Sequence, residues 1–305
     1  MTIGIPKALL YYKYHILWEN FFSYLNINTV TSQSTNKEIL DVGIKNSIDE
    51  ACLSLKIYLG HIKYLCGKCD YVLIPRIVSL NKNEKLCTNF SALYDIVKNT
   101  YKVKILNYNI DVDKNYDELY AFVSMARELG ISRYKAVKAY IYAKEKEKED
   151  ETAKIIKQES LIKTNKLKIL IAGHDYNIYD EFVGKTIIDY LKKMDVVPIT
   201  SDICKKTYTD FDYKMISKDL YWTYNKEILS SINHYLKEVD GIILISTFPC
   251  GPDSLSNEIV VRKIKNKPII TIIIDELNNS SGLITRLESF VDILKERKGM
   301  NLYEQ

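Results

Sequence analysis

Glycine and proline are scarce in this sequence, whose 305 residues include only 11 glycines and 6 prolines. It contains no G-x-G-x-x-G fingerprint and no P-loop, the glycine-rich turns with which many nucleotide-binding proteins hold phosphate groups. The H-E-x-x-H motif of zinc proteases, the G-x-S-x-G motif of hydrolases and the kinase motifs are absent as well. Candidate functional residues therefore have to be sought outside these signatures.

Long hydrophobic segments are also missing. The most apolar stretches, such as Ile269 to Ile274, have the length of a β-strand and fall well short of the ~18 residues that a membrane-spanning helix needs. The first residues, Met1 to Lys7, lack the basic region followed by an apolar one that marks a secretory signal. We therefore expect a cytoplasmic protein that does not enter a membrane.

Arginine is rare, and the formal net charge is only +4. The basic residues are spread along the chain, whereas a nucleic-acid-binding protein concentrates them, preferably as arginine, on one face. We therefore expect no nucleic-acid partner.

What the sequence does contain is a globular composition, with 47% hydrophobic and 27% charged residues. The length suggests two domains of roughly 150 residues each. We place an N-terminal domain at residues 1–131, a charged helical linker at 132–165 and a C-terminal domain at 166–305. The linker is predicted to be an exposed helix because it has no glycine or proline and is rich in lysine and glutamate.

Both domains alternate β-strands with α-helices. Thr35 is the predicted N-cap of a helix that starts at Asn36, with Glu38 completing a capping box. Pro75 is expected to confine the ladder of its strand to the residues before it or to a sheet edge. The predicted strands are 3–5, 28–31, 71–77, 103–106, 168–172, 196–200, 241–247 and 268–274, and the predicted helices include 8–25, 49–65, 89–98, 117–129, 181–193, 225–237, 254–265 and 283–297.

This pattern predicts an α/β protein with two Rossmann-like (flavodoxin-like) parallel-sheet lobes, joined by a long helix and leaving a cofactor cleft between them. Such sheets bind ligands beyond the carboxyl ends of their strands. In the C-terminal lobe, His174 and Glu276 lie at that edge and are candidates for catalysis or for a position close to a cofactor.

Six cysteines are the residues best suited to carry chemistry. In a cytoplasmic chain, clustered cysteines are more often metal ligands or reactive thiols than disulfides. Cys250 is the most informative because it follows a buried strand and precedes a helix whose expected N-cap is Asp253 or Ser254. The amides and the dipole at the start of that helix would stabilise a thiolate or an anionic cluster.

The other cysteines divide into two groups. Cys52 lies at a helix start and Cys87 follows a strand, so that with Cys250 they would supply three thiolates from separate loops, which suits an iron–sulfur cubane with one open iron. Cys66 and Cys69 form a C-x-x-C, whose spacing fits a redox pair, half of a zinc site or further cluster ligands. Cys204 has no partner in sequence and is most simply a buried apolar residue.

Long motifs in a fixed order extend through nearly the whole chain. They are 3–12, 35–40, 49–52, 74–79, 173–177, 248–254 and 282–288. With these motifs the chain resembles the proteins related to 2-hydroxyacyl-CoA dehydratases and benzoyl-CoA reductases, often labelled CoA-substrate-specific enzyme activase-related.

The resemblance implies an oxygen-sensitive [4Fe–4S] cluster, with Cys52, Cys87 and Cys250 matching the family's ligands by position. It implies low-potential electron transfer or reductive catalysis, ATP-dependent through an actin-like ATPase that donates the electrons. It also implies a homodimer or a heterodimer with a related subunit. Some relatives carry a double-cubane cluster, for which Cys66, Cys69 and Cys204 would be further ligands.

The sequence departs from the family at two positions. Thr88 stands where a proline is frequent and Leu277 where a histidine is common, which bears more on catalysis than on cluster binding. Two other functions stay open. One is a cluster-free α/β module that binds a small anion, and the other is a zinc-stabilised accessory subunit built around the C-x-x-C.

Overall fold

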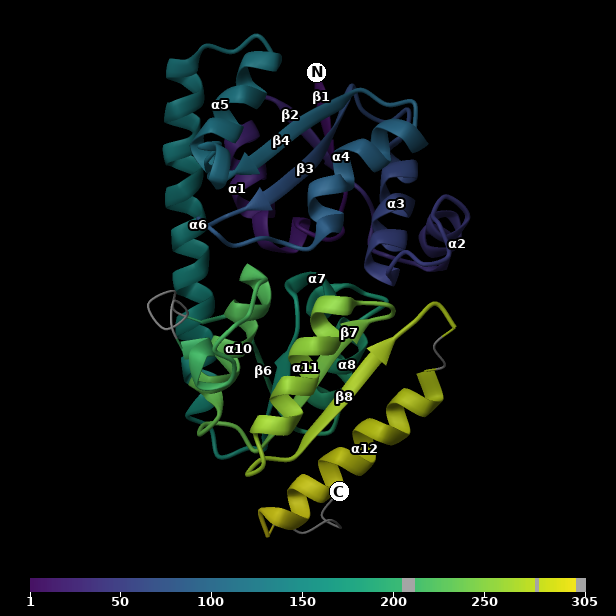
Figure 1. The fold of residues 1–305 in the computed structure, drawn as a ribbon, viewed down its shortest axis with the longest axis vertical. Coiled ribbons are helices and arrows are strands. Elements are labelled where there is room, and N and C mark those ends of the chain that lie inside the picture. The colour runs from purple at the N-terminus through teal and green to yellow at the C-terminus, as the bar shows by residue number, and fades with distance from the viewer. Residues whose placement is uncertain (205–211, 278–279, 300–305) are drawn as a thin grey trace. The chain divides into compact units, whose positions relative to one another are not determined.

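The computed structural model describes residues 1–204, 212–277 and 280–299. The chain divides into two α/β units (Figure 1), one formed by Met1–Ala153 with Tyr221–Tyr224 and the other by Lys154–Leu220 with Asn225–Gln305. In the described residues, each unit contains a four-stranded parallel sheet. The prediction of two Rossmann-like parallel-sheet lobes is confirmed.

The sheet of the first unit has the strand order β2-β1-β3-β4. Right-handed crossovers place α1, which connects β1 to β2, on one face of the sheet. They place α3 and α4 on the other face, because the chain then crosses β1 in the opposite direction. The elements of this unit are β1 (Thr2–Ile5), α1 (Tyr11–Tyr24), β2 (Asn28–Thr31), α2 (Lys37–Lys45), α3 (Leu53–Leu65), β3 (Tyr71–Ser79), α4 (Thr88–Thr100), β4 (Ile105–Asp111), the 3-10 helix η1 (Val112–Lys114), α5 (Glu118–Glu128) and the first part of α6 (Arg133–Ile162).

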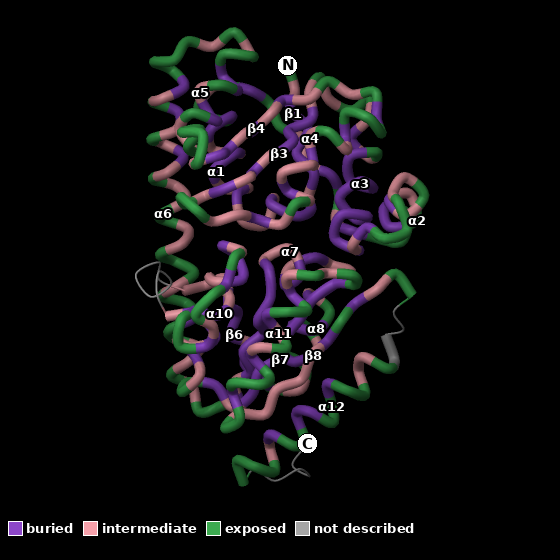
Figure 2. Tube along the Cα trace, in the orientation of Figure 1, coloured by how far each residue is buried: buried purple, intermediate pink, exposed green. Residues whose placement is uncertain are grey.

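Aromatic side chains fill the core on the α1 face. Trp18 of α1 and Phe122 of α5 both pack edge-on against Tyr108 of β4, with ring centroids 5.5 and 5.2 Å away. All three are almost completely buried, as are the central strands and the inner sides of the helices (Figure 2). The aromatic residues of the first helix, spaced for one helical face, thus serve the core.

The second unit repeats this topology with the order β6-β5-β7-β8. Every residue of β7 is buried, as expected for a central strand that is covered on both faces. The elements are β5 (Lys168–Ala172), α7 (Asp175–Tyr179), α8 (Lys185–Lys193), β6 (Val197–Thr200), the 3-10 helix η2 (Asp212–Met215), α10 (Thr223–Tyr235), β7 (Gly241–Thr247), α11 (Gly251–Lys263), β8 (Ile269–Ile274) and α12 (Ser280–Arg297).

The charged segment predicted as an exposed linker is the 30-residue helix α6, which contributes residues to both units. Ala136, Ala139 and Ala143 are fully buried, so the small side chains of one stripe pack against the first unit. Near the other end, the buried Gln158 side chain accepts the N–H of Thr200 at 2.9 Å and donates to its C=O at 3.1 Å. Both parts of the helix are therefore integrated into packed units.

Two local predictions need correction. The N-cap of α2 is Asn36, whose side chain accepts the N–H of Ile39, and Thr35 instead hydrogen-bonds His61. Pro75 lies inside the ladder of a central strand, opposite Tyr108 of β4. Successive backbone nitrogens of a strand point to alternate sides, and the N–H of Val72 points toward β4. The nitrogen of Pro75, three residues later, therefore points toward β1. Because the pairing of β3 with β1 ends at Val72, the missing N–H of Pro75 costs no hydrogen bond of the ladder.

Among the helices that the structure describes, none is both long enough and apolar enough to cross a membrane.

Candidate functional site

Each of the two sheets has its own topological switch point. In each sheet the first strand lies next to the third, so the loops that follow these two strands start side by side at the carboxyl edge of that sheet. Open α/β sheets bind ligands at this place, because the two loops run to opposite faces and separate there. The loops after β1 and β3 occupy this position in the first unit, and those after β5 and β7 in the second.

In the first unit, Cys52 and Cys87 are the N-cap residues of α3 and α4. The Nδ2 atom of Asn89, in the first turn of α4, donates to the sulfur of Cys52 at 3.6 Å. Cys52 therefore lies beside the helix start that Cys87 caps. Both thiols are half-buried and stand at the positive ends of helix dipoles, which favour a thiolate.

In the second unit, Cys250 is the N-cap residue of α11 and follows a cis peptide bond between Phe248 and Pro249. The helix itself begins at Gly251, so the N-cap is Cys250 and not Asp253 or Ser254 as predicted. Cys87 and Cys250 hold equivalent positions, since each caps the helix that follows the third strand of its sheet.

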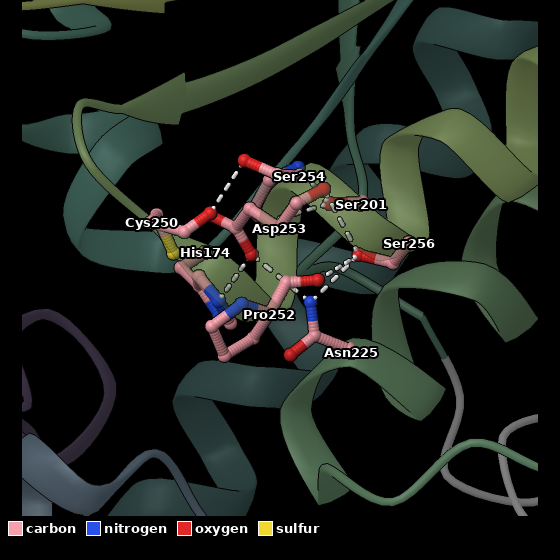
Figure 3. Close-up of polar contacts among 9 residues, drawn as sticks. His174, Ser201, Asn225, Cys250, Pro252, Asp253, Ser254 and Ser256 are labelled. Atoms are coloured by element: carbon pink, nitrogen blue, oxygen red, sulfur yellow. Dashed lines mark hydrogen bonds and ion pairs between the residues drawn. The ribbon is translucent and has the colours of Figure 1, made fainter.

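A buried polar cluster supports Cys250 (Figure 3). The Nε2 atom of His174 lies 2.9 Å from Oδ1 of Asp253, and the two side chains are only 8% and 4% exposed. Nδ2 of Asn225 donates to the same oxygen at 3.0 Å and to Oγ of Ser256 at 2.9 Å. The cluster joins the loop after β5 to the first turns of α10 and α11.

Burial by itself would raise the pKa of Asp253. The charge of His174 and hydrogen bonds from His174, Asn225 and Cys250 outweigh burial, and the pKa of this carboxyl is lowered from its ordinary value. Asp253 is thus a buried carboxylate in contact with both the thiol and the imidazole. It connects His174, a predicted candidate, to Cys250.

Sequence reasoning treated Asp253 only as a possible cap and did not find Asn225 at all. The signal for Asp253 was its position three residues after Cys250, one helical turn along, where its side chain can reach back to the helix start. Asn225 carried no such signal, because it comes from a helix 25 residues earlier in the sequence.

The C-x-x-C lies at the other end of α3 from Cys52. Cys66 is the C-cap of this 13-residue helix, which places the pair about 20 Å from the Cys52 end. The pKa of each thiol is raised by burial, although the backbone of Gly4 donates to Cys69 and partly counteracts this. Cys66 and Cys69 are therefore too far away to share a cubane with Cys52.

The two remaining predicted residues follow the other two strands of the second sheet. Cys204 is half-buried, four residues after the end of β6. Glu276 is exposed, two residues after the end of β8. His174 is joined to the N-cap Cys250 through Asp253, which contacts both.

The six cysteines, all in the described part of the chain, form no disulfide with one another. Within residues 1–204, 212–277 and 280–299, no three or more His, Cys, Asp or Glu side chains are grouped as the ligands of a metal ion. The predicted iron–sulfur centre thus rests on the thiol positions within each unit.

Comparisons with known proteins find a matching family model and similar solved structures. A solved structure of UDP-GlcNAc 2-epimerase from Methanocaldococcus jannaschii is similar at 14% identity and a TM-score of 0.23, over 96% of this chain and 92% of that one. A search of curated proteins finds no significant match. The model of the CoA enzyme activase uncharacterised domain (DUF2229) matches residues 2–204. Since this match covers about two thirds of the sequence, the chain belongs to the CoA enzyme activase family that the domain describes.

Proposed function

We propose that this chain is an iron–sulfur protein in which Cys52, Cys87 and Cys250 ligate a [4Fe–4S] cluster and which acts in ATP-dependent, low-potential electron transfer or reductive catalysis. The observation that carries the proposal is that each of these cysteines is the N-cap of a helix. In the described residues, Cys66 is the C-cap of α3 and Cys69 follows it, so neither is an N-cap. The three predicted ligands thus share a feature that the C-x-x-C pair lacks.

The chemistry of an N-cap thiol fits the proposed cofactor. A [4Fe–4S] cluster with its thiolates carries negative charge, and its potential depends on hydrogen bonds to sulfur and on burial. Helix starts supply N–H groups and a positive dipole end without introducing a competing side-chain base. The N–H···S contact from Asn89 to Cys52 is of the same kind.

Family membership supports the wider part of the proposal. The matched domain is described as a CoA enzyme activase domain, which favours a role beside enzymes that act on CoA compounds. We propose that an actin-like ATPase donates electrons to the chain, and that the chain assembles as a homodimer or with a related subunit. Both follow from the resemblance in sequence.

The decisive experiment measures iron, acid-labile sulfide and zinc in the anaerobically purified full chain. We expect about four irons per chain, and visible charge-transfer absorption, if one cubane is bound. Cys52→Ser, Cys87→Ser and Cys250→Ser should each lose most of the iron. The matched controls are Cys204→Ser and the double variant Cys66→Ser with Cys69→Ser, which should keep it.

Four results would contradict the proposal. Full iron in Cys250→Ser would show that this thiol is not a ligand. About eight irons that fall when Cys66 and Cys69 are replaced would favour the double-cubane cluster. Stoichiometric zinc lost in the same double variant would favour the zinc-stabilised subunit, and a protein without iron would favour the cluster-free module.

The proposed electron donor needs a separate test. The oxidised chain would be mixed anaerobically with the actin-like ATPase activator of a 2-hydroxyacyl-CoA dehydratase, a reductant and either ATP or a non-hydrolysable analogue. We expect the cluster signal to change, as followed by electron paramagnetic resonance, only with ATP. Equal reduction with the analogue would contradict ATP dependence.

A further inference from the structure

We propose that the first unit carries a separate binding site for a phosphate-type oxyanion, formed by Lys7 and Ser34 at the carboxyl edge of β1 and β2. Lys7 is the second residue after β1 and Ser34 the third after β2. The two strands are paired neighbours with Ile5 opposite Thr31, so both residues extend from the same edge. Lys7 also lies at the switch point of the sheet, where ligands bind in this architecture.

The Lys7 ammonium is the cation of this site. It is half-buried and makes, among the described residues, one hydrogen bond, to Oγ of Ser34 at 2.8 Å, and no ion pair. An ammonium has three N–H donors, and long cationic side chains are rarely withdrawn from water without an anionic partner. Two donors of Lys7 therefore remain available to a ligand.

A buried network holds this loop in place. Oγ of Ser32 accepts the backbone N–H of Lys7 at 2.8 Å and lies 2.8 Å from Nδ1 of His61. The other ring nitrogen of His61 lies 3.0 Å from Oγ1 of Thr35. His61 is completely buried, so its ring fixes the loop after β1 relative to the loop after β2.

The positive charge of Lys7 acts on the buried His61 of this network. Burial, and secondarily the positive charge of Lys7, lower the pKa of His61 to about 3, so the imidazole is neutral at physiological pH. The site therefore presents one localised positive charge on a neutral hydrogen-bonding support. Such an arrangement attracts an anion without a compensating carboxylate of its own.

The equivalent place in the second unit shows what is missing here. There, Asp253 is the third residue after the N-cap Cys250, and its buried carboxylate contacts His174. The third residue after the equivalent N-cap, Cys87, is Phe90, which is 3% exposed and packs edge-on against Tyr224. The first unit thus has an apolar ring where the second has an internal anion.

The ammonium of Lys7 favours a phosphate group. Its hydrogens, held in place by the Ser34 hydroxyl, bind oxygen atoms of an anion, and a dianion gains more from a compact ammonium than a single carboxylate does. No planar fork of the kind that arginine offers to a carboxylate is present in these two side chains. The ligand class is therefore a phosphate ester, diphosphate or inorganic phosphate.

The test is isothermal titration of the full chain, as purified anaerobically, with inorganic phosphate, diphosphate and acetate in low-salt chloride buffer. We expect both phosphates to bind more tightly than acetate. Lys7→Met should weaken phosphate binding at least about tenfold, whereas Lys7→Arg should retain it. Ser34→Ala should weaken it less. The control is Lys98→Met, an exposed lysine of the same unit that lies over the Tyr94 ring.

Several outcomes would overturn the site: no phosphate binding to the wild type, equal binding to Lys7→Met, equal loss in Lys98→Met, or acetate binding as tightly as phosphate. Circular dichroism establishes that each variant is folded, and binding retained in Lys7→Arg shows that the loop is intact. The site uses no cysteine, so Cys250→Ser should bind phosphate normally. This inference therefore stands or falls independently of the iron–sulfur proposal.

Discussion

The two units have one topology but different chemistry at the same edge. Each has its first strand next to its third, and a cysteine caps the helix after that third strand. Ser32 and Ser201 are also equivalent, because each directly follows the second strand and accepts a backbone N–H from the loop after the first, from Lys7 and Gly173. The backbone framework is thus shared.

The side chains on that framework differ in charge balance. In the second unit, the Asp253 carboxylate lies in contact with the His174 imidazole inside the protein. In the first, the partner that the described residues give the Lys7 ammonium is a hydroxyl, and the buried histidine behind it is neutral. The same fold thus supplies a place for a ligand in each unit. The third residue after the N-cap cysteine, Asp253 in the second unit and Phe90 in the first, sets whether that residue gives the place an anion of its own.

The largest expected effect comes from removing the internal anion. Asp253→Ala leaves the buried His174 and Asn225 without their shared acceptor, and we expect it to lower the free energy of unfolding by about 3 kcal/mol or more. The measurement is urea unfolding followed by circular dichroism. Glu258→Ala, which breaks an exposed pair with Arg262 on the same helix, is the control and should cost about 0.5 kcal/mol or less. Equal losses would show that the buried cluster adds no stability.

The next effect is a pH dependence confined to the first unit. Unfolded His61 takes up a proton below pH ~6.5, whereas the folded residue, with its pKa lowered to about 3, does not. The unfolded state therefore binds more protons between these values, and stability falls as the pH drops from about 6.5 to about 3. By pH 5 the loss should reach about 2 kcal/mol.

Tryptophan fluorescence can follow this loss, because Trp18 and Trp222 both belong to the first unit. His61→Gln, compared with the wild type at each pH, should remove this part of the dependence. An unchanged pH slope in His61→Gln would contradict the buried neutral imidazole.

A smaller effect tests the equivalence of the two serines. Ser201→Ala removes the acceptor of the Gly173 N–H and the donor to the Gly173 C=O, and should cost about 1 kcal/mol. Ser32→Ala should cost more, about 2 kcal/mol, because it removes the acceptor of the Lys7 N–H and leaves a ring nitrogen of the completely buried His61 without its partner. Urea unfolding by circular dichroism, with fluorescence for the first unit, gives both values. A larger loss for Ser201→Ala would contradict the proposed difference between the units.

The smallest effect concerns the influence of Lys7 on His61. Lys7→Met removes a positive charge that contributes to the low pKa of the imidazole, so that pKa should rise while remaining low, because burial is the larger cause. The measurement is a nuclear magnetic resonance titration of the His61 ring, with Lys98→Met as the control. No rise, or a rise of equal size in the control, would show that the Lys7 charge does not reach the network.

Much of the fold could be predicted because its signals are local. The continuous apolar strand 241–247 and its neighbours indicated a parallel sheet, and the structure places them there. The predictions that were wrong depended on residues that are distant in sequence and close in space. Thr35 looked like a cap until His61 proved to be its partner, and Pro75 looked like a break until the ladder showed its nitrogen on the unpaired side.

The candidate site divides in the same way. Its cysteines and His174 could be named from motifs, but the contacts of Asp253 with His174 and with Asn225 join segments 79 and 28 residues apart. The site formed by Lys7 and Ser34 was not predicted, because no motif pairs these two residues and their separation of 27 positions hides their proximity.

By itself, the sequence determined the alternation of strands and helices, the parallel sheets and the family, because hydrophobic periodicity and motif order are properties of contiguous residues. Only the tertiary structure decided that Asn89 of α4 contacts the sulfur of Cys52 and that Asp253 contacts His174. It also decided that Lys7 has the hydroxyl of Ser34 as its partner. The physical reason is that hydrogen bonds and charges act over a few ångströms in space, and the chain brings those partners together only when the sheets form.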